Sequence, residues 1–275
     1  FLRLFGKRTL TQITAERFSK LVSWEKIIIV TTSDDYKKEI LSELPNLHPE
    51  NIIVEPARKN TGPAHGLGAL FIAKRDPDAV ILTSPTDHLV NPDKKYTDVM
   101  QVAAEAAYSG DLLVTVGVKP TYPHTGYGYV KRGSKFSEIS GKTLYRVAKF
   151  TEKPDIDTAK AFFKSGDYYW NTSQFVWRAD SILEALNKHA QDVYKLLTKI
   201  AKSLGTNDQD KIISEAYKEM PEIAIDYAVA EKAKNFVVVP ADYHWTDIGD
   251  WNEVWENLDK DETGNVVIDG DEPGG

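Results

Sequence analysis

Two aspartates that stand far apart in the sequence each follow a run of apolar residues. Asp87 comes soon after Ala79–Leu82, and Asp247 comes soon after Phe236–Pro240. If both runs are strands of a parallel α/β sheet, both acids lie at its carboxyl edge, where such folds bind ligands. Together the two carboxylates could share one hard divalent cation and the phosphate that it carries. Taken singly, each aspartate is more simply a turn residue.

A second polar segment, Glu55–Ala64, lies between an expected strand and an expected helix. Thr61 or Gly62 can cap this helix, with Pro63 at its first position, where a missing N–H costs nothing. The free N–H groups and the helix dipole suit an anion or the polar edge of a base. An ordinary helix start explains the same residues equally well.

Several polar residues in the second half of the chain could bind a phosphosugar. Lys153 could hold a phosphate as a point charge, and Glu152 could accept sugar hydroxyls, although a surface ion pair is the simpler interpretation. Gly128 allows a ligand to approach the backbone closely. Asn171 both donates and accepts hydrogen bonds, as sugar hydroxyls require. For Asp226, at the start of an expected helix, a favourable interaction with the helix dipole is the simplest account.

These residues need a sheet to position them, and the apolar pattern predicts one. In the first half, strands are expected over 26–32, 51–54, 79–82 and 111–118, alternating with helices over 9–22, 36–44, 63–74 and 94–107. Continuous Val- and Ile-rich strands in such alternation indicate a mostly parallel sheet covered on both faces. The second half is mixed, with strands over 128–130, 145–150, 175–177 and 236–239, and helices over 181–202, 209–218, 227–233 and 251–258.

The bulk properties narrow the function further. A chain of 275 residues suits one large α/β domain, and a net charge of -7 argues against nucleic acid as a partner. No apolar run approaches the roughly 18 residues of a membrane helix, so no membrane partner is expected. The chain has no cysteine, which excludes disulfides and thiolate chemistry and is compatible with the cytoplasm, where we expect it. It also has no Walker A loop, Gly-x-Ser-x-Gly elbow or His-Glu-x-x-His motif.

As a set, these motifs resemble the sugar-1-phosphate nucleotidyltransferases, and among them most closely the mannose-1-phosphate guanylyltransferases, also called GDP-mannose pyrophosphorylases. The similarity follows the family's order over nearly the whole chain, in residues 55–64, 85–88, 126–129, 150–154, 170–174, 225–231 and 245–251. It implies a Rossmann-like nucleotidyltransferase fold with a mixed, mostly parallel sheet flanked by helices. It also implies that GMP is transferred from GTP to mannose 1-phosphate, giving GDP-mannose and pyrophosphate.

The resemblance also assigns residues to roles. Asp87 and Asp247 match the aspartates that bind Mg²⁺, and Lys153 matches the lysine on the sugar phosphate, so these three are the expected catalytic residues. The residues expected around the sugar are Gly128, Glu152, Lys153 and Asn171. Those expected on the nucleotide side are Glu55, Asn60, Thr61 and Asp87.

The resemblance sets the expected domain limits as well. Residues 1–260 form the nucleotidyltransferase domain, and about 25 further residues, a strand and a glycine-rich loop, are expected before Phe1. Residues 261–275 are expected to begin a truncated carboxyl-terminal segment, with a strand or β-helix starting at 265–268.

Two other functions remain open at this point. One is the synthesis of another sugar nucleotide, UDP- or dTDP-glucose, by the same chemistry. The other is a non-catalytic paralogue that binds a sugar nucleotide and regulates a partner. The presence of Asp87, Asp247 and Lys153 together favours an enzyme, because a pure binder could lose its metal. The family also implies a homodimer.

Overall fold

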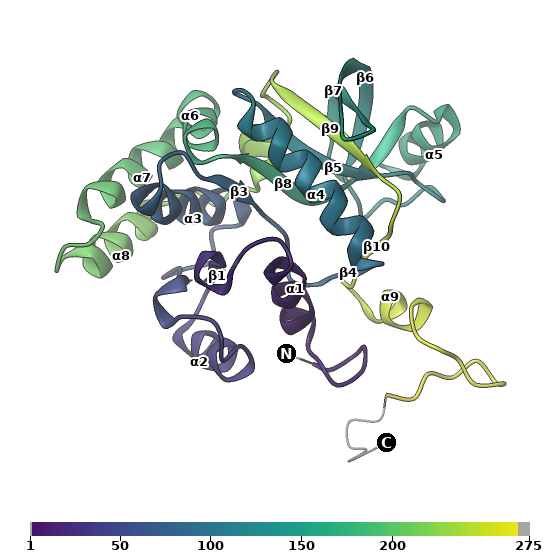
Figure 1. The fold of residues 1–275 in the computed structure, drawn as a ribbon, viewed down its shortest axis with the longest axis horizontal. Coiled ribbons are helices and arrows are strands. Elements are labelled where there is room, and N and C mark those ends of the chain that lie inside the picture. Colours follow the sequence, from purple (N-terminus) through teal and green to yellow (C-terminus); the bar gives the residue numbers. More distant parts are fainter. Residues whose placement is uncertain (1, 269–275) are drawn as a thin grey trace.

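The computed structural model describes residues 2–268 and is built on a six-stranded mixed sheet (Figure 1). Its strand order is β3-β8-β5-β9-β7-β6, with β6 also pairing with β8. The strands are β3 (Val80–Leu82), β5 (Leu113–Val118), β6 (Tyr129–Ile139), β7 (Lys142–Thr151), β8 (Tyr168–Arg178) and β9 (Phe236–Ala241). The predicted α/β class and mixed sheet are therefore confirmed.

Strand direction decides where the two aspartates emerge. Strand β8 is antiparallel to both β3 and β5, so β3 and β5 run the same way, and β9 is parallel to β5. The carboxyl ends of β3 and β9 consequently lie at the same edge of the sheet. The chain continues from these ends towards Asp87 and Asp247, as the sequence predicts.

Helices cover both faces of this sheet because its central strands are apolar on both sides. One face packs against α4 (Asp93–Tyr108), which Figure 1 shows lying across the strands, and contributes Val114, Val116, Val237 and Val239. The other face contributes Leu113, Phe236 and Val238. It packs against the helices α3 (Thr61–Arg75), α6 (Ala179–His189), α7 (Gln191–Ser203) and α8 (Gln209–Glu219).

The amino-terminal part forms a smaller unit. Strands β1 (Ile29–Thr31) and β2 (Ile52–Val54) pair in parallel as a separate two-stranded sheet. Apolar residues of α1 (Leu10–Ser19) and α2 (Asp34–Glu43), among them Ala15 and Ile40, share a third core with Ile52. Helix α1 begins at a capping box, in which Thr9 and Gln12 each accept a hydrogen bond from the other's backbone N–H. The short 3₁₀ helices are η1 (Trp24–Lys26) and η2 (Pro49–Asn51).

A further pair of short strands was not predicted. Strands β4 (His88–Asn91) and β10 (His244–Asp247) pair antiparallel as a two-stranded sheet. Helix α9 (Trp251–Glu256) follows β10 and is capped by the side chain of Asp250. The remaining helix, α5 (Ile156–Ser165), lies beside β8.

Four predicted elements differ in the structure. Strand β8 begins at Tyr168, well before the expected 175, and the helix expected over 181–202 is interrupted at Ala190. The helix expected over 227–233 is a π-helix, η3 (Asp226–Ala230). Residues 265–268 form no strand, and the end of the expected segment, 269–275, lies outside the described residues. Within residues 2–268 no helix is long and apolar enough to cross a membrane.

Candidate active site

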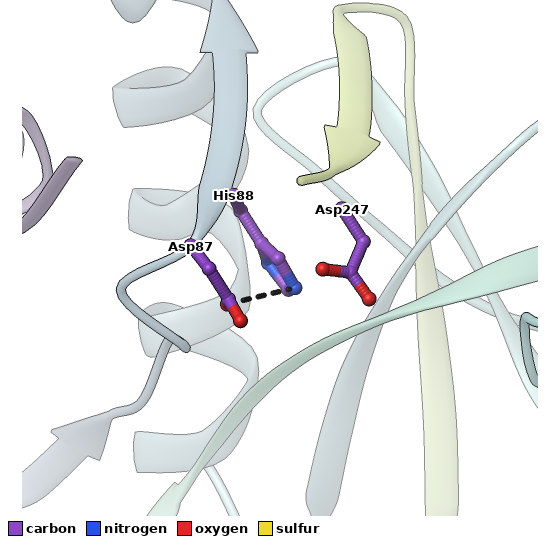
Figure 2. Close-up of side chains that lie close together, drawn as sticks. All are labelled: Asp87, His88 and Asp247. Atoms are coloured by element: carbon purple, nitrogen blue, oxygen red, sulfur yellow. Dashed lines mark ion pairs between the residues drawn. The ribbon is translucent and has the colours of Figure 1, made fainter. Parts of the chain in front are cut away.

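The β4–β10 pair brings the two predicted metal-binding acids together. Asp247 is opposite His88 in the strand register, and the Ile248 N–H donates to the Asp87 carbonyl oxygen at 3.0 Å. Asp87, His88 and Asp247 point towards one another (Figure 2), with one potential ligand atom of each lying within 4.8 Å of the others. Two acids that are distant in sequence thus converge because β10, which carries Asp247, pairs with β4, which begins directly after Asp87.

His88 is a buried, neutral ring beside the two acids. Its ring is buried, and burial together with the charge of Arg17 lowers its pKa to about 3, so the ring is neutral. Trp245 Nε1 donates to His88 Nδ1 at 3.3 Å, which leaves the ring proton on Nε2. Nε2 lies 3.9 Å from Asp87 Oδ1. Because Nε2 then carries a proton towards the acids, the two carboxylates are the better metal ligands.

The electrostatics of the acid pair favour a bound cation. Burial first, and the negative charge of Asp87 second, raise the pKa of Asp247 to about 6. Burial also raises the pKa of Asp87. The positive charge of Lys153 offsets only part of the cost of ionising Asp247. Carboxylate oxygens are hard ligands, so the donor set fits a hard divalent cation.

The predicted sugar-side residues also lie together. The Asn171 N–H donates to the Gly128 carbonyl oxygen at 2.8 Å, and a Cβ at position 128 would overlap the Glu152 carboxylate. Burial first, and then the charge of Asp226, raise the pKa of Glu152 to about 7. A side chain at position 128 would therefore require the Glu152 carboxylate to move.

Lys153 connects the sugar side with the metal side. It is exposed, lies two residues after the end of β7 and has a positive φ of 42°. Its charge acts on Asp247, Glu152 and Asp226, lowering the pKa of each against the larger effect of burial. The charge of Lys153 therefore acts on acids from three segments of the chain.

The nucleotide-side loop differs from its prediction in one respect. Asn60, at a positive φ of 67°, is the N-cap of α3 and accepts from the Thr61 N–H at 2.8 Å, where Thr61 or Gly62 had been expected to cap. The Gly62 N–H donates to the Ile223 carbonyl oxygen at 2.9 Å, and Pro63 has no N–H. Protein acceptors thus occupy the first donors of the helix, which disfavours an open anion site there.

Glu55 makes its side-chain contact with α8. Its carboxyl group is buried, and Tyr217 Oη of that helix donates to Oε1 at 2.8 Å. Burial raises the pKa of Glu55 to about 7. The structure therefore joins Glu55 to α8, and its role on the nucleotide side stays a prediction.

Asp226 belongs to the site although the sequence suggested only a helix-dipole role. Its side chain is buried and Oδ1 accepts from Asn171 Nδ2 at 3.2 Å. Burial raises its pKa to about 6. The partner lies 55 residues away in sequence, so no local pattern could reveal this contact.

The fold is that of a class of enzymes that transfer nucleotides, as the comparison with known proteins shows. A family model described as nucleotidyl transferase matches residues 1–264, and the chain belongs to this family. The nucleotidyltransferase resemblance in the sequence is thereby confirmed.

Two similar proteins are named for the same activity. The chain is 38% identical over 271 residues to the mannose-1-phosphate guanylyltransferase of Klebsiella pneumoniae and, at the same identity and length, to that of Escherichia coli. Both alignments cover 97% of this chain and 56% of the relative, so the chain spans about half the length of these proteins.

A solved structure agrees over most of the fold. A crystal structure from Thermus thermophilus, described as a mannose-1-phosphate geranyltransferase, superposes with a TM-score of 0.78 at 28% identity. The match covers 90% of this chain and 69% of that one. The architecture in Figure 1 is therefore shared with a protein that is named for mannose 1-phosphate.

Proposed function

We propose that this chain transfers GMP from GTP to mannose 1-phosphate, producing GDP-mannose and pyrophosphate. The observation that carries the proposal is the convergence of Asp87 and Asp247 in one cluster of ligand atoms within 4.8 Å. Relatives named mannose-1-phosphate guanylyltransferase, 38% identical over 97% of the chain, supply the choice of substrates.

The reaction requires that the charges of the two phosphate-bearing substrates be neutralised and that the substrates be positioned; it depends less on proton transfer. A sugar-phosphate oxygen attacks the α-phosphorus of GTP, forming a new P–O bond while the bond to the β-phosphate oxygen breaks and pyrophosphate leaves. The phosphate monoester has a second pKa near 6 and is largely dianionic at neutral pH, so it needs no general base. Lys153 offsets the negative charge of this nucleophile.

We propose that Asp87 and Asp247 hold Mg²⁺, whose charge would offset that of the phosphate oxygens. Gly128, Glu152 and Asn171 would contact the sugar, because they gather beside Lys153. The nucleotide would contact the side formed by Glu55, Asn60 and Thr61, together with Asp87.

We also propose that the enzyme works as a homodimer in the cytoplasm, as the family resemblance implies. Light scattering coupled to size-exclusion chromatography measures the mass directly. A mass near twice 30.9 kDa supports the dimer, and a mass near 30.9 kDa contradicts it.

The test of the activity is pyrophosphate release with GDP-mannose identified by chromatography. GTP with mannose 1-phosphate should react in Mg²⁺ and stop in EDTA, whereas UTP or dTTP with glucose 1-phosphate should react at least tenfold more slowly. Omitting the sugar phosphate controls for hydrolysis of GTP. A faster reaction with UTP or dTTP and glucose 1-phosphate would show that the proposed substrates are wrong. If no pair of substrates reacts, the non-catalytic alternative is favoured.

The proposed metal role predicts the effect of removing one carboxylate. Asp247→Ala should lower kcat at least a hundredfold. The metal would lose one of its two carboxylate ligands, so it would no longer offset the charges of the phosphates. Asp87→Ala should act in the same direction, and Asp259→Asn, an exposed acid in the same part of the chain, serves as the matched control. A near-normal kcat for Asp247→Ala at saturating Mg²⁺ would exclude a metal role for that residue.

A further inference from the structure

Residues 223–226 run between the two sides of the candidate site and bond to the nucleotide-side loop. The Ile223 N–H donates to the Lys59 carbonyl oxygen at 3.2 Å, and its own carbonyl oxygen accepts from the Gly62 N–H at 2.9 Å. Two residues later, the Ile225 N–H donates to Thr61 Oγ1 at 2.9 Å. The position of this segment is thereby fixed on the loop that precedes α3.

The next residue, Asp226, bonds to the sugar side. The residue is only 8% exposed, and its carboxylate accepts from Asn171 Nδ2 at 3.2 Å. At the other end of η3, the Glu231 carboxylate accepts from the Glu152 N–H at 3.4 Å. This single turn of π-helix therefore contacts both residues that stand beside Gly128.

The contacts of Asn171 define how its carboxamide is oriented. Oδ1 accepts from Thr115 Oγ1 at 2.9 Å and from the Ser173 N–H at 3.3 Å, which uses both oxygen lone pairs. Nδ2 has two N–H groups, and one of them is donated to Asp226. The amide thus keeps one N–H for a ligand, and the acceptor at 226 decides where that N–H points.

We propose that Asp226 is a positioning residue, which orients the Asn171 carboxamide for the sugar phosphate and links it through Ile225 to the nucleotide-side loop. The inference rests on the proposed function, which places Asn171 beside the sugar and Thr61 beside the nucleotide. Asp226 acts through Asn171 and makes no contact with the reacting phosphates in this account. The backbone of the preceding residue, Ile225, bonds to the nucleotide-side loop, and the side chain of Asp226 bonds to the sugar side. A displacement of one side of the site should therefore displace the other.

The test compares two substitutions of similar size at position 226. Asp226→Leu removes the acceptor, and should raise the KM for mannose 1-phosphate about tenfold with kcat and the KM for GTP changed less. Asp226→Asn keeps an oxygen acceptor for Asn171 and should restore the KM to within about threefold. Glu222→Ala, exposed in the same segment, is the control and should leave both KM values at the wild-type level. Circular dichroism confirms that each variant is folded.

Equal KM values in Asp226→Leu and wild type would overturn the proposal, as would equal increases in the Leu and Asn variants, which would indicate charge instead of orientation. The Kd of GDP-mannose by calorimetry must follow the same order of variants and needs no turnover. A wild type without guanylyl transfer would refute the proposed function. An active wild type with unresponsive variants would refute only this inference.

The link to the nucleotide side has its own pair of variants. Thr61→Val removes the hydroxyl that accepts from the Ile225 N–H, and should raise the KM for mannose 1-phosphate about threefold in addition to any effect on GTP. Thr61→Ser keeps the hydroxyl and should lie closer to wild type in the KM for the sugar phosphate. A Thr61→Val enzyme altered only in its KM for GTP would contradict the link.

Discussion

The side chain of Glu55 is buried, with the residue only 5% exposed, and its protonation is coupled to folding. Burial raises its pKa from 4.5 to about 7, so between these values the unfolded chain ionises while the folded protein keeps the proton. Stability therefore falls as pH rises through this window, by up to roughly 3 kcal/mol from this group. Glu55→Gln keeps an acceptor for Tyr217 and removes the ionisation. We expect its stability relative to wild type to increase between pH 5 and pH 8.

Urea unfolding of both proteins at pH 5 and pH 8 gives this relative stability directly. Glu50→Gln, exposed and in the same region, controls for the loss of one carboxylate and should show no such change with pH. If the difference in free energy of unfolding between Glu55→Gln and wild type stays constant from pH 5 to pH 8, the pKa of Glu55 is the same in the folded and the unfolded protein.

At the level of single residues, the sequence was informative where the position in an element was enough. Asp87 and Asp247 were predicted together because each follows an apolar run, and the structure brings them together. The contact of Asp226 with Asn171 was not predicted, because it spans 55 residues. The tautomer of His88 likewise depends on Trp245, which lies 157 residues away. Such contacts form only in the folded protein, so the spacing of neighbouring residues in the sequence does not predict them.

At the level of elements, the strands predicted best were the ones with continuous apolar residues. Strands β5 and β9 could be predicted because both of their faces are buried, and β3 because it is apolar throughout. Strands β4 and β10 were missed, since each is four residues long and carries polar residues such as His88 and Asp247. Their pairing is stabilised by contacts between distant segments. The local sequence therefore gives the weakest signal for β4 and β10, the two strands that bring the acids together.

The contact between the nucleotide-side loop and residues 223–226 predicts how one glycine behaves. A Cβ at Gly62 would lie 2.6 Å from the Ile223 carbonyl oxygen, so Gly62→Ala should destabilise the protein by about 2 kcal/mol and disturb this hydrogen-bonded contact. In the same helix, a Cβ at Gly68 would meet only Val30 Cγ2, at 3.4 Å. Gly68→Ala should be neutral or stabilise by up to about 1 kcal/mol, because alanine favours helix.

Denaturant unfolding of the two alanine variants beside wild type measures both effects. The order expected in free energy of unfolding is Gly68→Ala at or above wild type, with Gly62→Ala lowest. Equal stability of Gly62→Ala and wild type would mean that residues 223–226 are not held against the loop as described.

At the scale of the whole molecule, the site lies where the sheet collects the ends of distant strands. Alternating apolar runs and helical stripes were enough to predict the α/β class, because strands buried on both faces need helices on both sides. They could not predict that β8 inserts between β3 and β5, since strand order is decided by pairings between remote segments. Strand β8 also carries Asn171, so this insertion places the sugar-side residue at the same edge as the acids.

The two acids at the carboxyl edge of the sheet should destabilise the protein when no cation is bound, although the proposed function requires them. The ionised Asp87 and Asp247 repel each other, and the pKa of Asp247, raised to about 6, means that this cost is complete by pH 8. Asp247→Asn should therefore stabilise the protein in EDTA at pH 8, on the order of 1 kcal/mol after solvent screening. With Mg²⁺ and GDP-mannose the order should reverse. Wild type gains about 2.7 kcal/mol at a hundred times Kd, and the variant gains much less.

Thermal or urea unfolding in EDTA and in Mg²⁺ with GDP-mannose gives the four free energies, with Asp259→Asn as the variant that should follow wild type in both. We expect Asp247→Asn to be the more stable protein in EDTA and wild type to be the more stable in Mg²⁺ with GDP-mannose. This reversal would show that the acid pair destabilises the free protein and is stabilised by its ligand. If Asp247→Asn gained as much from Mg²⁺ and GDP-mannose as wild type does, the cation would not depend on Asp247. The raised pKa of Asp247 would then reflect burial and the charge of Asp87, without any role in holding the cation.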